Sequence, residues 1–424
     1  MGQVILSISA LLSGMALIFL GHGMLGTLLP LRMGMAEFPP FVVGMVMSAY
    51  FVGTVFGVFL GGRLIANVGH IRTFAALASI ISAAAVAHPF LVAPLPWGML
   101  RLVHGFCLAG ILMCTESWLN ERVTNEIRGR VFSFYMISIY LAQGGGQFLL
   151  NLEGDSQFTL FIIASILFSL ALVPVAITRV QAPAPIKPSR LRLKELYATS
   201  PLGISGAFAS GVILGGFYGL APYFAQQTGL GFDGAAKFMA AAIVGGLLLQ
   251  WPMGRLSDRF DRRTVFGGLA LAACVTSVAF FILPEGEQAP LLVLAAVFGG
   301  TLFTLYPLCV AHTNDHIERG DLVRASGGLI VTYGIGAAIG PVATAGLISL
   351  VGPFGLFIFI AAVALAIASF TFWRMGQRPA PTAEQQAPFQ PVPRTTPVAS
   401  QLDPRSESGE PGFEFESSEP DRPA

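Results

Sequence analysis

The chain carries few charged residues for its length. Of its 424 residues, only 11% are Asp, Glu, Lys or Arg, whereas soluble globular proteins carry about 25%. The formal net charge is +1, so the composition gives no sign of the basic surface that nucleic-acid-binding proteins present. A hydrophobic fraction of 54% instead predicts a polytopic membrane protein in contact with the lipid bilayer. We therefore expect neither an ordinary soluble enzyme nor a nucleic-acid partner.

Residues that usually build metal or nucleotide sites are also scarce. The four cysteines lie in apolar runs without a C-x-x-C pair, so we expect neither a disulfide framework nor a zinc site. None of the three lysines follows a glycine, which excludes a phosphate-binding P-loop. No G-x-S-x-G or H-E-x-x-H pattern is present. His312, Asp315 and His316 are interpreted as a polar cluster at the membrane surface, and we expect no cofactor, no metal and no enzymatic activity.

Long apolar runs fill most of the chain as far as residue 374. A helix that spans a bilayer needs about 20 mostly apolar residues, and twelve stretches meet that requirement. The runs are continuous rather than alternating, which favours helices over a β-barrel. We therefore predict an all-α membrane protein with twelve transmembrane helices at 4–29, 41–66, 72–92, 95–119, 129–152, 157–178, 201–225, 234–256, 263–283, 288–313, 324–350 and 353–374.

The basic residues predict how these spans are oriented. Loops after even-numbered spans hold sixteen Lys and Arg residues, whereas loops after odd-numbered spans hold only Arg32 and Lys237. Lys and Arg concentrate in the cytoplasmic loops of membrane proteins. We therefore expect both termini to be cytoplasmic, in a multi-pass protein of the plasma membrane, with a bacterial inner membrane as the expected location.

Short matches between the two halves predict an internal repeat. Gly62-Arg63-Leu64 follows the second span, and Gly254-Arg255-Leu256 follows the eighth, 192 positions later. Two parallel six-helix repeats are typical of secondary transporters. The predicted domains are an N-terminal bundle at 1–178, a cytoplasmic linker at 179–200, a C-terminal bundle at 201–374 and a disordered cytoplasmic tail at 375–424.

One loop carries a family resemblance. The stretch GRLSDRFDRR at 254–263 resembles the G-x-L-x-D-R-x-G-R-R loop of the major facilitator superfamily, with Asp261 in place of the second glycine. The copy after the second span, GRLIANVGHIR at 62–72, has Ala66 at the acidic position. The resemblance extends over 1–374. It implies two six-helix bundles that rock about a site at the membrane midplane.

The fourth span carries further matches to this superfamily. Arg101 and Gly105 resemble the R-x-x-x-G pattern of its drug–proton antiporters. The stretch ESWLN at 116–120, followed by Arg128-Gly129-Arg130, is similar to its poorly characterised YcaD-like branch. The antiporters also have a Gly-Pro pair in the fifth helix, where this chain has Gly144-Gly145-Gly146-Gln147. That departure argues against drug efflux in particular.

Three ionisable residues inside predicted spans are candidates for proton coupling. A charge at a helix centre costs about 2.5–3.5 kcal/mol on insertion scales, so such residues are functional candidates. Arg101 stays protonated at physiological pH, so we expect it to bias a neighbouring group rather than carry the proton. His104 and His22 are side chains that titrate near neutral pH. The structural alternatives are an interfacial anchor for Arg101 and buried packing roles for the two histidines.

Polar side chains at membrane depth are candidates for a solute pocket. A neighbouring helix can instead satisfy each polar tip, so this alternative stays open for every one of them. The candidates are Tyr50, Tyr140, Gln143, Gln147, Tyr218, Gln250 and Tyr306.

Charged residues at the predicted cytoplasmic ends of the helices are candidates for a gate. Asp258 ends the eighth span, and we expect it to meet the start of the fifth span near Arg128 when the cytoplasmic side is shut, because helix N-termini and Arg both favour carboxylates. Glu116 is interpreted either as part of this gate or as an ion pair with Arg72 or Arg122. The gate candidates are Gly254, Asp258, Arg259, Arg262, Arg263, Glu116, Arg128 and Arg72.

Glycines recur every four residues in two spans. They lie at 53, 57 and 61 in the second span and at 336 and 340 in the eleventh. This spacing predicts close approach between helix backbones.

These features together predict a secondary active transporter that moves a small organic solute by alternating access. Protons are the expected coupling ion, and we expect a monomer. A facilitative uniporter is one alternative. A transporter-fold membrane sensor, which binds solute without moving it, is another.

Overall fold

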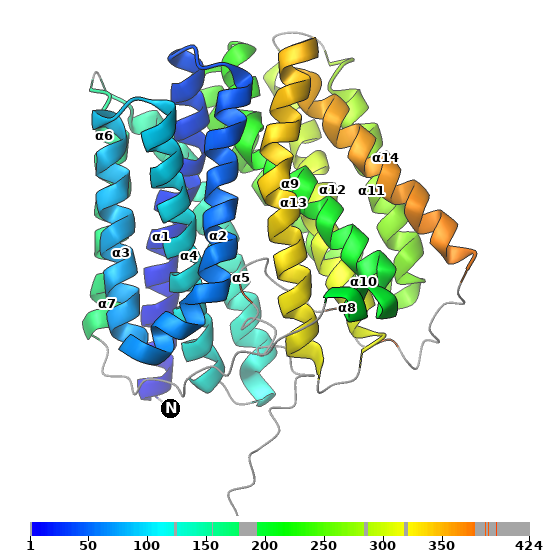
Figure 1. Cartoon of the computed structure of the whole chain (residues 1–424), viewed down its shortest axis with the longest axis horizontal. Helices are drawn as coiled ribbons and strands as arrows, with labels where there is room; N and C mark the ends of the chain where they lie inside the picture. Colours follow the sequence, from blue (N-terminus) through cyan, green and yellow to red (C-terminus); the bar gives the residue numbers. More distant parts are fainter. Residues whose placement is uncertain are drawn as a thin grey trace, which may run out of the picture.

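The computed structural model describes residues 2–122, 125–154, 156–177, 193–283, 287–317 and 321–377, together with Gln386, Phe389 and Thr396. Within these ranges the regular elements are helices (Figure 1). Helices are the expected solution for long apolar runs, because all backbone hydrogen bonds form within one segment.

The first half of the chain forms one group of helices. Its elements are α1 (Gly2–Met35), α2 (Pro40–Val68), α3 (His70–Ala87), the 3₁₀ turn η1 (His88–Phe90), α4 (Pro94–Arg122), α5 (Asn125–Phe148), the 3₁₀ turn η2 (Leu149–Leu152), α6 (Thr159–Leu170) and α7 (Leu172–Ile177).

The second half begins with a short helix and repeats the pattern. Its elements are α8 (Leu193–Thr199), α9 (Pro201–Gln227), α10 (Gly231–Arg259), α11 (Arg262–Ala279), α12 (Gln288–Asn314), α13 (Leu322–Val351) and α14 (Gly355–Met375). The helix α8 lies in the predicted linker. Residues 178–192 of that linker and most of the predicted tail fall outside the described residues.

Helices occur at all twelve predicted positions, but the sixth is divided. It is broken between α6 and α7, where Pro174 has no N–H to donate to the preceding turn. Ten helices are long and apolar enough to cross a membrane, and α5 and α11 are not among them in the described chain. The multi-pass membrane protein is therefore confirmed, whereas the count of twelve spans stays a prediction.

The two halves repeat one pattern of helix packing. In the first half α2 packs on α4, α1 on α5 and α3 on α6. In the second half α10 packs on α12, α9 on α13 and α11 on α14. These pairs correspond in chain order, so the fold consists of two repeats.

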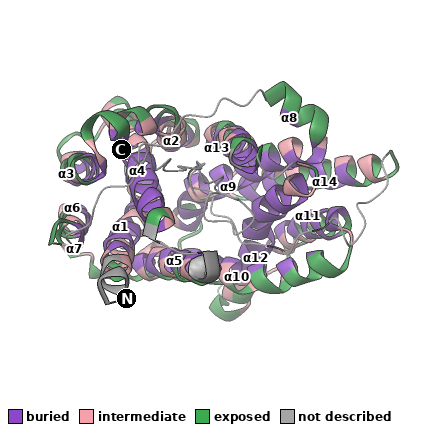
Figure 2. Ribbon diagram, turned by 90° about the horizontal axis from the view of Figure 1, so that it is seen from below, coloured by how far each residue is buried: buried purple, intermediate pink, exposed green. Residues whose placement is uncertain are grey.

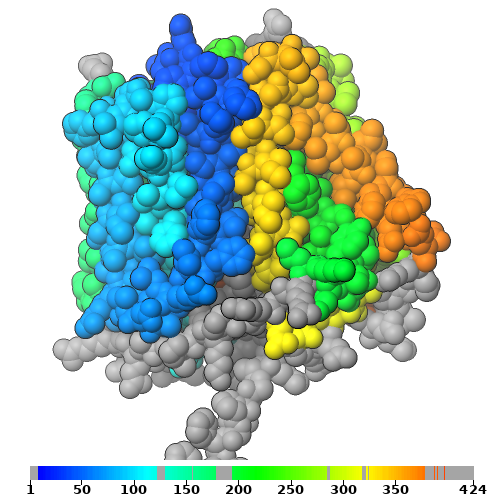
Figure 3. All heavy atoms as spheres, viewed as in Figure 1, coloured from blue at the N-terminus to red at the C-terminus, as the bar shows by residue number. Residues whose placement is uncertain are grey.

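The halves meet along α2 and α13, and along α5 and α10. Figure 3 shows α2 and α13 side by side on one face of the molecule. We call the side on which α1 begins the N-terminal side and the opposite side the far side. In Figure 1, α2 and α13 run close together near the far side and separate toward the N-terminal side.

In Figure 2 the buried residues lie mainly where the helices face one another, and the exposed residues lie mainly around the outside. The outer surface carries large apolar side chains, including Phe59 at 58%, Leu248 at 65% and Val275 at 66% exposure. In a membrane these side chains contact lipid rather than water.

Candidate functional site

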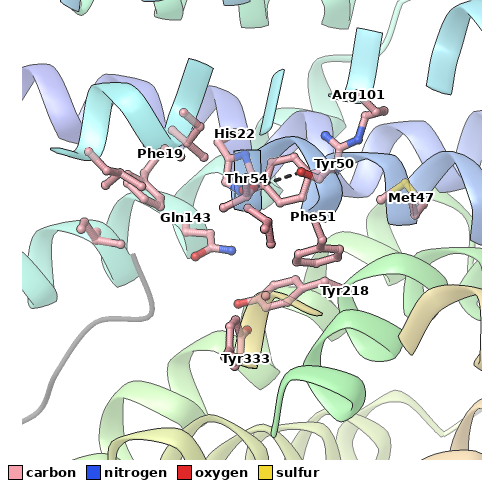
Figure 4. Close-up of a pocket in the computed structure, with 18 of the residues that line it drawn as sticks. Phe19, His22, Met47, Tyr50, Phe51, Thr54, Arg101, Gln143, Tyr218 and Tyr333 are labelled. Atoms are coloured by element: carbon pink, nitrogen blue, oxygen red, sulfur yellow. Dashed lines mark hydrogen bonds between the residues drawn. The ribbon is translucent and has the colours of Figure 1, made fainter. Parts of the chain in front are cut away.

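A central cavity lies between the two halves. Its walls come from α1, α2, α4 and α5 of the first half and from α9, α10 and α13 of the second. Figure 4 shows His22, Tyr50 and Arg101 on one side, with Tyr218 and Tyr333 from the second half opposite them. Its volume of about 160 Å³ is roughly ten times what one water molecule needs, so it has room for a small organic molecule.

His22, which lines this cavity, forms a pair with a second histidine, His104. His22 Nδ1 on α1 lies 3.2 Å from His104 Nε2 on α4, a hydrogen bond whose donor depends on the tautomers. His104 is fully buried, and among the described atoms its Nδ1 has no hydrogen-bond partner. The pair therefore retains a free nitrogen for a proton or a ligand.

Arg101 lies beside this pair, one turn before His104 on α4. Its side chain is only 2% exposed, and its guanidinium carbon lies 4.4 Å from the centre of the Tyr50 ring, a cation–π contact. The Tyr50 ring lies 5.4 Å from the His22 ring and 5.8 Å from the His104 ring. Tyr50 thus contacts both the cation and the imidazole pair.

Close packing of α2 on α4 produces this arrangement. A Cβ atom added to Gly53 would overlap the carbonyl oxygen of Leu102, and one added to Gly105 would overlap that of Tyr50. A Cβ on Gly57 would lie 2.7 Å from the Phe106 carbonyl oxygen. The structure confirms the close approach predicted from the glycine spacing, and this approach brings Tyr50 against Arg101.

Five of the seven predicted pocket residues line the cavity, and they are Tyr50, Tyr140, Gln143, Gln147 and Tyr218. Gln147 also joins helices, because its Nε2 donates to the Gly23 carbonyl at 3.0 Å and its Oε1 accepts from Thr27 at 2.6 Å. Gln250 and Tyr306 are not among the lining residues. Tyr306 instead packs on Tyr333, with the ring centres 5.0 Å apart.

The lining residues that the sequence analysis missed include Thr27, Phe51, Thr54 and Tyr333. Thr54 lies one turn after Tyr50 on α2, and its hydroxyl donates to the Tyr50 carbonyl at 3.0 Å. This one-turn spacing was an available signal. Nothing in the sequence distinguishes Phe51 from the many other apolar residues, because the second half of the fold determines that it faces the cavity.

The predicted gate loop forms ion pairs within the second half. Arg262 Nη2 lies 3.2 Å from Asp258 Oδ1, and Arg262 Nε lies 3.0 Å from Asp315 Oδ2. The side chains of Arg262 and Asp315 are both 1% exposed. The two carboxylates therefore fix the start of α11 against the ends of α10 and α12.

Asp261, the residue that departs from the superfamily pattern, caps α11. Its Oδ1 accepts from the backbone N–H of Arg263 at 2.9 Å, and its carboxylate also pairs with the Arg263 side chain at 2.8 Å. Burial raises the pKa of Asp261, but the hydrogen bonds and charge of Arg263 outweigh it, so the pKa lies below its ordinary value. The substitution of glycine by Asp thus adds a helix cap.

The other gate candidates are more dispersed. Glu116 is fully buried on α4 and accepts a hydrogen bond from the Tyr135 hydroxyl at 3.0 Å. Arg72 and Arg259 are exposed. The side chain of Arg128 lies outside the described residues, so the predicted contact between Asp258 and Arg128 stays a prediction.

Two described residues of the C-terminal tail contact this region. The backbone N–H of Phe389 donates to Asp258 Oδ1 at 2.8 Å, and its ring covers Gly254. Thr396 is fully buried, and its hydroxyl donates to Glu116. Asp258 belongs to the second half and Glu116 to the first, so these two tail residues contact both halves.

Charged groups join the halves on the far side. Arg32 at the end of α1 pairs with Glu153 at 2.7 Å, and its guanidinium lies 5.6 Å from the centre of the Phe232 ring on α10. Burial raises the pKa of Glu153 above its ordinary value, although the charge of Arg32 acts in the opposite direction. Arg32 therefore holds residues of both halves together.

Polar and backbone contacts also join the halves on the far side, and we call all of these contacts the far-side seal. Asn151 donates to Asp233 at 3.3 Å across the interface of η2 and α10. A Cβ on Gly44 of α2 would lie 2.7 Å from the Pro341 carbonyl oxygen on α13. The halves thus pack without a gap where α2 and α13 meet on the far side.

The histidine cluster at the end of α12 lies near the gate loop. The His312 and His316 rings have centres 4.6 Å apart, and the Asp315 carboxylate forms an ion pair with Arg262. No group of three or more His, Cys, Asp or Glu side chains within the described ranges is arranged to hold a metal.

Two helical repeats around a central cavity define a membrane transporter fold. The chain matches the family model of the Major Facilitator Superfamily at residues 11–251 and 203–402, and it belongs to that family. It is 31% identical to the "Uncharacterized MFS-type transporter YcaD" of Salmonella enteritidis PT4 (strain P125109) over 377 residues, which cover 88% of this chain and 97% of that relative. The resemblance to the YcaD-like branch is thereby confirmed.

Solved structures share the fold at low sequence identity. The nucleoside transporter NupG superposes with a TM-score of 0.74 at 16% identity, covering 89% of this chain and all of that one. An inward-facing, unoccupied bacterial homologue of the human lysosomal transporter Spinster superposes with a TM-score of 0.69 at 14% identity, covering 88% and 97%. These similarities establish the architecture, and the chemistry of the cavity must come from this chain's own residues.

Proposed function

We propose that this protein is a secondary active transporter that moves a small organic solute by alternating access, with protons as the coupling ion. The observation that carries the proposal is a hydrogen-bonded pair of histidines beside buried Arg101: His22 and Arg101 line the cavity between the two repeats, and His104 lies behind His22. Titratable groups in a membrane interior mark ion pathways. Histidine is the side chain whose charge changes near neutral pH.

The coupling follows from electrostatics. A proton on the imidazole pair places a second positive charge near Arg101, and the two charges repel strongly away from water. The other titratable groups that face the pair are Tyr50 and, from η1, His88. A solute that changes the charge beside Arg101 therefore changes the affinity of the histidine pair for a proton. By reciprocity, the bound proton must change the affinity for the solute by the same factor.

The contacts between the halves favour alternating access. The far side is closed by Arg32, Gly44 and their partners, whereas α2 and α13 separate toward the N-terminal side (Figure 1). Rocking of the two repeats about the cavity would exchange these arrangements. We further propose that the N-terminal side faces the cytoplasm of a bacterial inner membrane and that the protein works as a monomer.

Sidedness is tested with an introduced cysteine. In intact cells, an impermeant thiol reagent should leave Ser189→Cys unlabelled and should label Thr228→Cys, which is exposed at the far end of α9. Labelling of Ser189→Cys in preference to Thr228→Cys would reverse the proposed orientation.

Transport and coupling are tested in proteoliposomes that contain a pH-sensitive dye. Compounds that raise the melting temperature of the purified protein are added outside, and both solute uptake and internal acidification are measured. We expect both in the wild type, and slower, proton-independent uptake in His104→Gln. Uptake that is indifferent to an imposed pH gradient would indicate the uniporter. Binding without uptake would indicate the sensor.

A further inference from the structure

Arg101 is a buried cation without an anionic partner in the part of the chain that the structure describes. Of its nitrogen atoms, Nε and Nη1 are buried and have no hydrogen-bond partner among the described residues, and its guanidinium lies over the Tyr50 ring. A buried charge is costly unless it is paired, and the membrane interior increases that cost. The fold therefore holds this positive charge at a cost in free energy that a bound anion would reduce.

The cavity supplies no such anion from its own side chains. Its lining contains no Asp or Glu, and the nearest acidic residue along α4, Glu116, is fifteen residues away, about 22 Å along a helix. The polar side chains of the lining beside Arg101 include Tyr50, whose ring the guanidinium contacts, and His22, whose ring packs on Tyr50. Both can donate hydrogen bonds, so the wall around Arg101 is suited to an acceptor-rich group.

The rest of the cavity is suited to an apolar, flat body. The rings of Phe19, Phe51 and Tyr218 line it, and Tyr333 closes it from α13 (Figure 4). Aromatic side chains favour offset or edge-to-face contacts with other rings. A guanidinium presents a planar fork that matches the two oxygens of a carboxylate.

From these observations we propose that the solute is an organic carboxylate with an apolar or aromatic body, and that Arg101 binds its carboxylate. This inference rests on the proposed transport function for its physiological meaning, but binding can be measured without transport. An anion at Arg101 would also reduce the repulsion felt by a proton on the histidine pair. Carboxylate and proton would then bind cooperatively and travel together.

The test compares acids with their uncharged amides on the full-length protein in nanodiscs. The probes are benzoate, phenylacetate and indole-3-acetate, each matched with its primary amide. We expect at least one acid to bind at least about 10-fold more tightly than its amide, because hydrogen bonds to charged groups are worth about 1.5–3 kcal/mol. Arg101→Gln should remove this preference and Arg101→Lys should retain part of it, whereas Arg255→Gln, at an exposed Arg on Trp251, should leave it unchanged.

The outcomes separate this inference from the proposed function. If none of the three acids binds more tightly than its amide, or if the preference survives in Arg101→Gln, the inference is wrong, even where a neutral solute is transported. If an acid binds through Arg101 but does not cross the membrane, the inference stands and the transporter proposal fails. Equal melting behaviour of Arg101→Gln and wild type would show that loss of binding is not loss of folding.

A second inference comes from the C-terminal tail. Phe389 contacts Gly254 and Asp258 on α10, and Thr396 contacts Glu116 on α4. The two residues are seven positions apart and hold opposite halves on the N-terminal side, where the sequence places the gate. Gly254, Asp258 and Glu116 are all gate candidates. Phe389 and Thr396 therefore contact residues that the halves would bring together in order to close.

We infer that the tail clamps the two halves through Phe389 and Thr396 and restricts entry to the cavity from the N-terminal side. The contacts are specific. Phe389 fills the space that a Cβ at residue 254 would occupy, and the Thr396 hydroxyl shares the carboxylate of Glu116 with Tyr135. Release of these two residues should therefore free the halves to separate on the N-terminal side and make the cavity easier to reach from there.

The test measures access to the cavity in the full-length protein. Val58→Cys, which lies in the wall toward the N-terminal side, is labelled with a bulky maleimide in nanodiscs and quantified on the peptide that contains residue 58. Phe389→Ala combined with Thr396→Val should label several-fold faster than the parent, and a chain ended after Gln377 should behave in the same way. Gln386→Ala, at another described tail residue, should match the parent. Equal rates in all four proteins would overturn the inference.

Discussion

Buried arginines in this protein occur in two different settings. Arg262 is paired with Asp315 and Asp258, whereas Arg101 contacts a tyrosine ring and has no carboxylate partner within the described ranges. Removing one partner of a buried pair leaves an uncompensated charge, but removing an unpaired buried charge removes the cost itself. Arg101 should therefore lower the stability of the fold while it serves binding, whereas Arg262 should stabilise the fold through its ion pairs.

This contrast predicts opposite effects of one substitution. Arg101→Leu should leave the melting temperature of the purified protein unchanged or raise it, by the equivalent of about 1 kcal/mol or more, while abolishing flux driven by a pH gradient. Arg262→Leu should destabilise by about 3–5 kcal/mol. Thermal unfolding of both variants in one detergent provides the measurement. A large loss of stability in Arg101→Leu would mean that the guanidinium is a structural anchor.

Asp261 gives a pH-dependent prediction outside the membrane-spanning segments. Because its folded pKa lies below the ordinary value, it stabilises the fold at pH values above the ordinary carboxyl pKa of about 3.9, and this contribution is lost as the pH falls through the folded pKa. Asp261→Asn should therefore unfold at a lower temperature at pH 7, by the equivalent of about 1 kcal/mol. The difference from wild type should shrink below about pH 4. A difference that is constant over pH 3–7 would contradict the role of the charge.

At the scale of whole helices, glycine rows determine where the cavity residues lie. The four-residue spacing in α2 was readable from the sequence, because small residues allow backbones to approach closely. Its partner was not readable, since Gly105 on α4 completes the contact from a distant part of the chain. The break between α6 and α7 was missed for a similar reason, because a single Pro in a long apolar run is often tolerated in a membrane helix.

The close contact of α2 and α4 makes Gly105 sensitive to enlargement. Gly105→Ala places a Cβ against the Tyr50 carbonyl and should destabilise by about 1–3 kcal/mol through overpacking. It should also weaken binding at Arg101, since Tyr50 moves with α2. Gly98→Ala on the same helix meets no atom within 4 Å and serves as the control. Thermal unfolding and probe binding are the measurements, and equal behaviour of both variants would exclude this explanation of the site.

At the scale of the molecule, the sequence predicted the two repeats but not the state they adopt. Matches at 62–64 and 254–256 indicated the duplication, and the packing of helices repeats accordingly. The far-side seal depends on contacts between residues separated by hundreds of positions, such as Gly44 with Pro341. Such pairs have no local signature, so periodicity and composition could not reveal them. The same holds for Phe389 and Thr396, whose range reads as a polar tail.

The far-side seal gives a prediction about the movement of the two halves. Gly44 on α2 lies against α13, where a larger side chain has no space, so Gly44→Leu should force the halves apart on that side. In intact cells, an impermeant thiol reagent should then label Gln143→Cys, a half-buried residue of the cavity wall, several-fold faster than in the Gln143→Cys parent. A Cβ atom at Gly346 on α13 would meet no atom within 4 Å, so Gly346→Leu should leave the rate unchanged. Because opening of one side is coupled to closure of the other in alternating access, Val58→Cys should at the same time become less accessible from the N-terminal side in inside-out vesicles. Faster labelling at both positions would instead indicate a loosened bundle rather than a shift between two states.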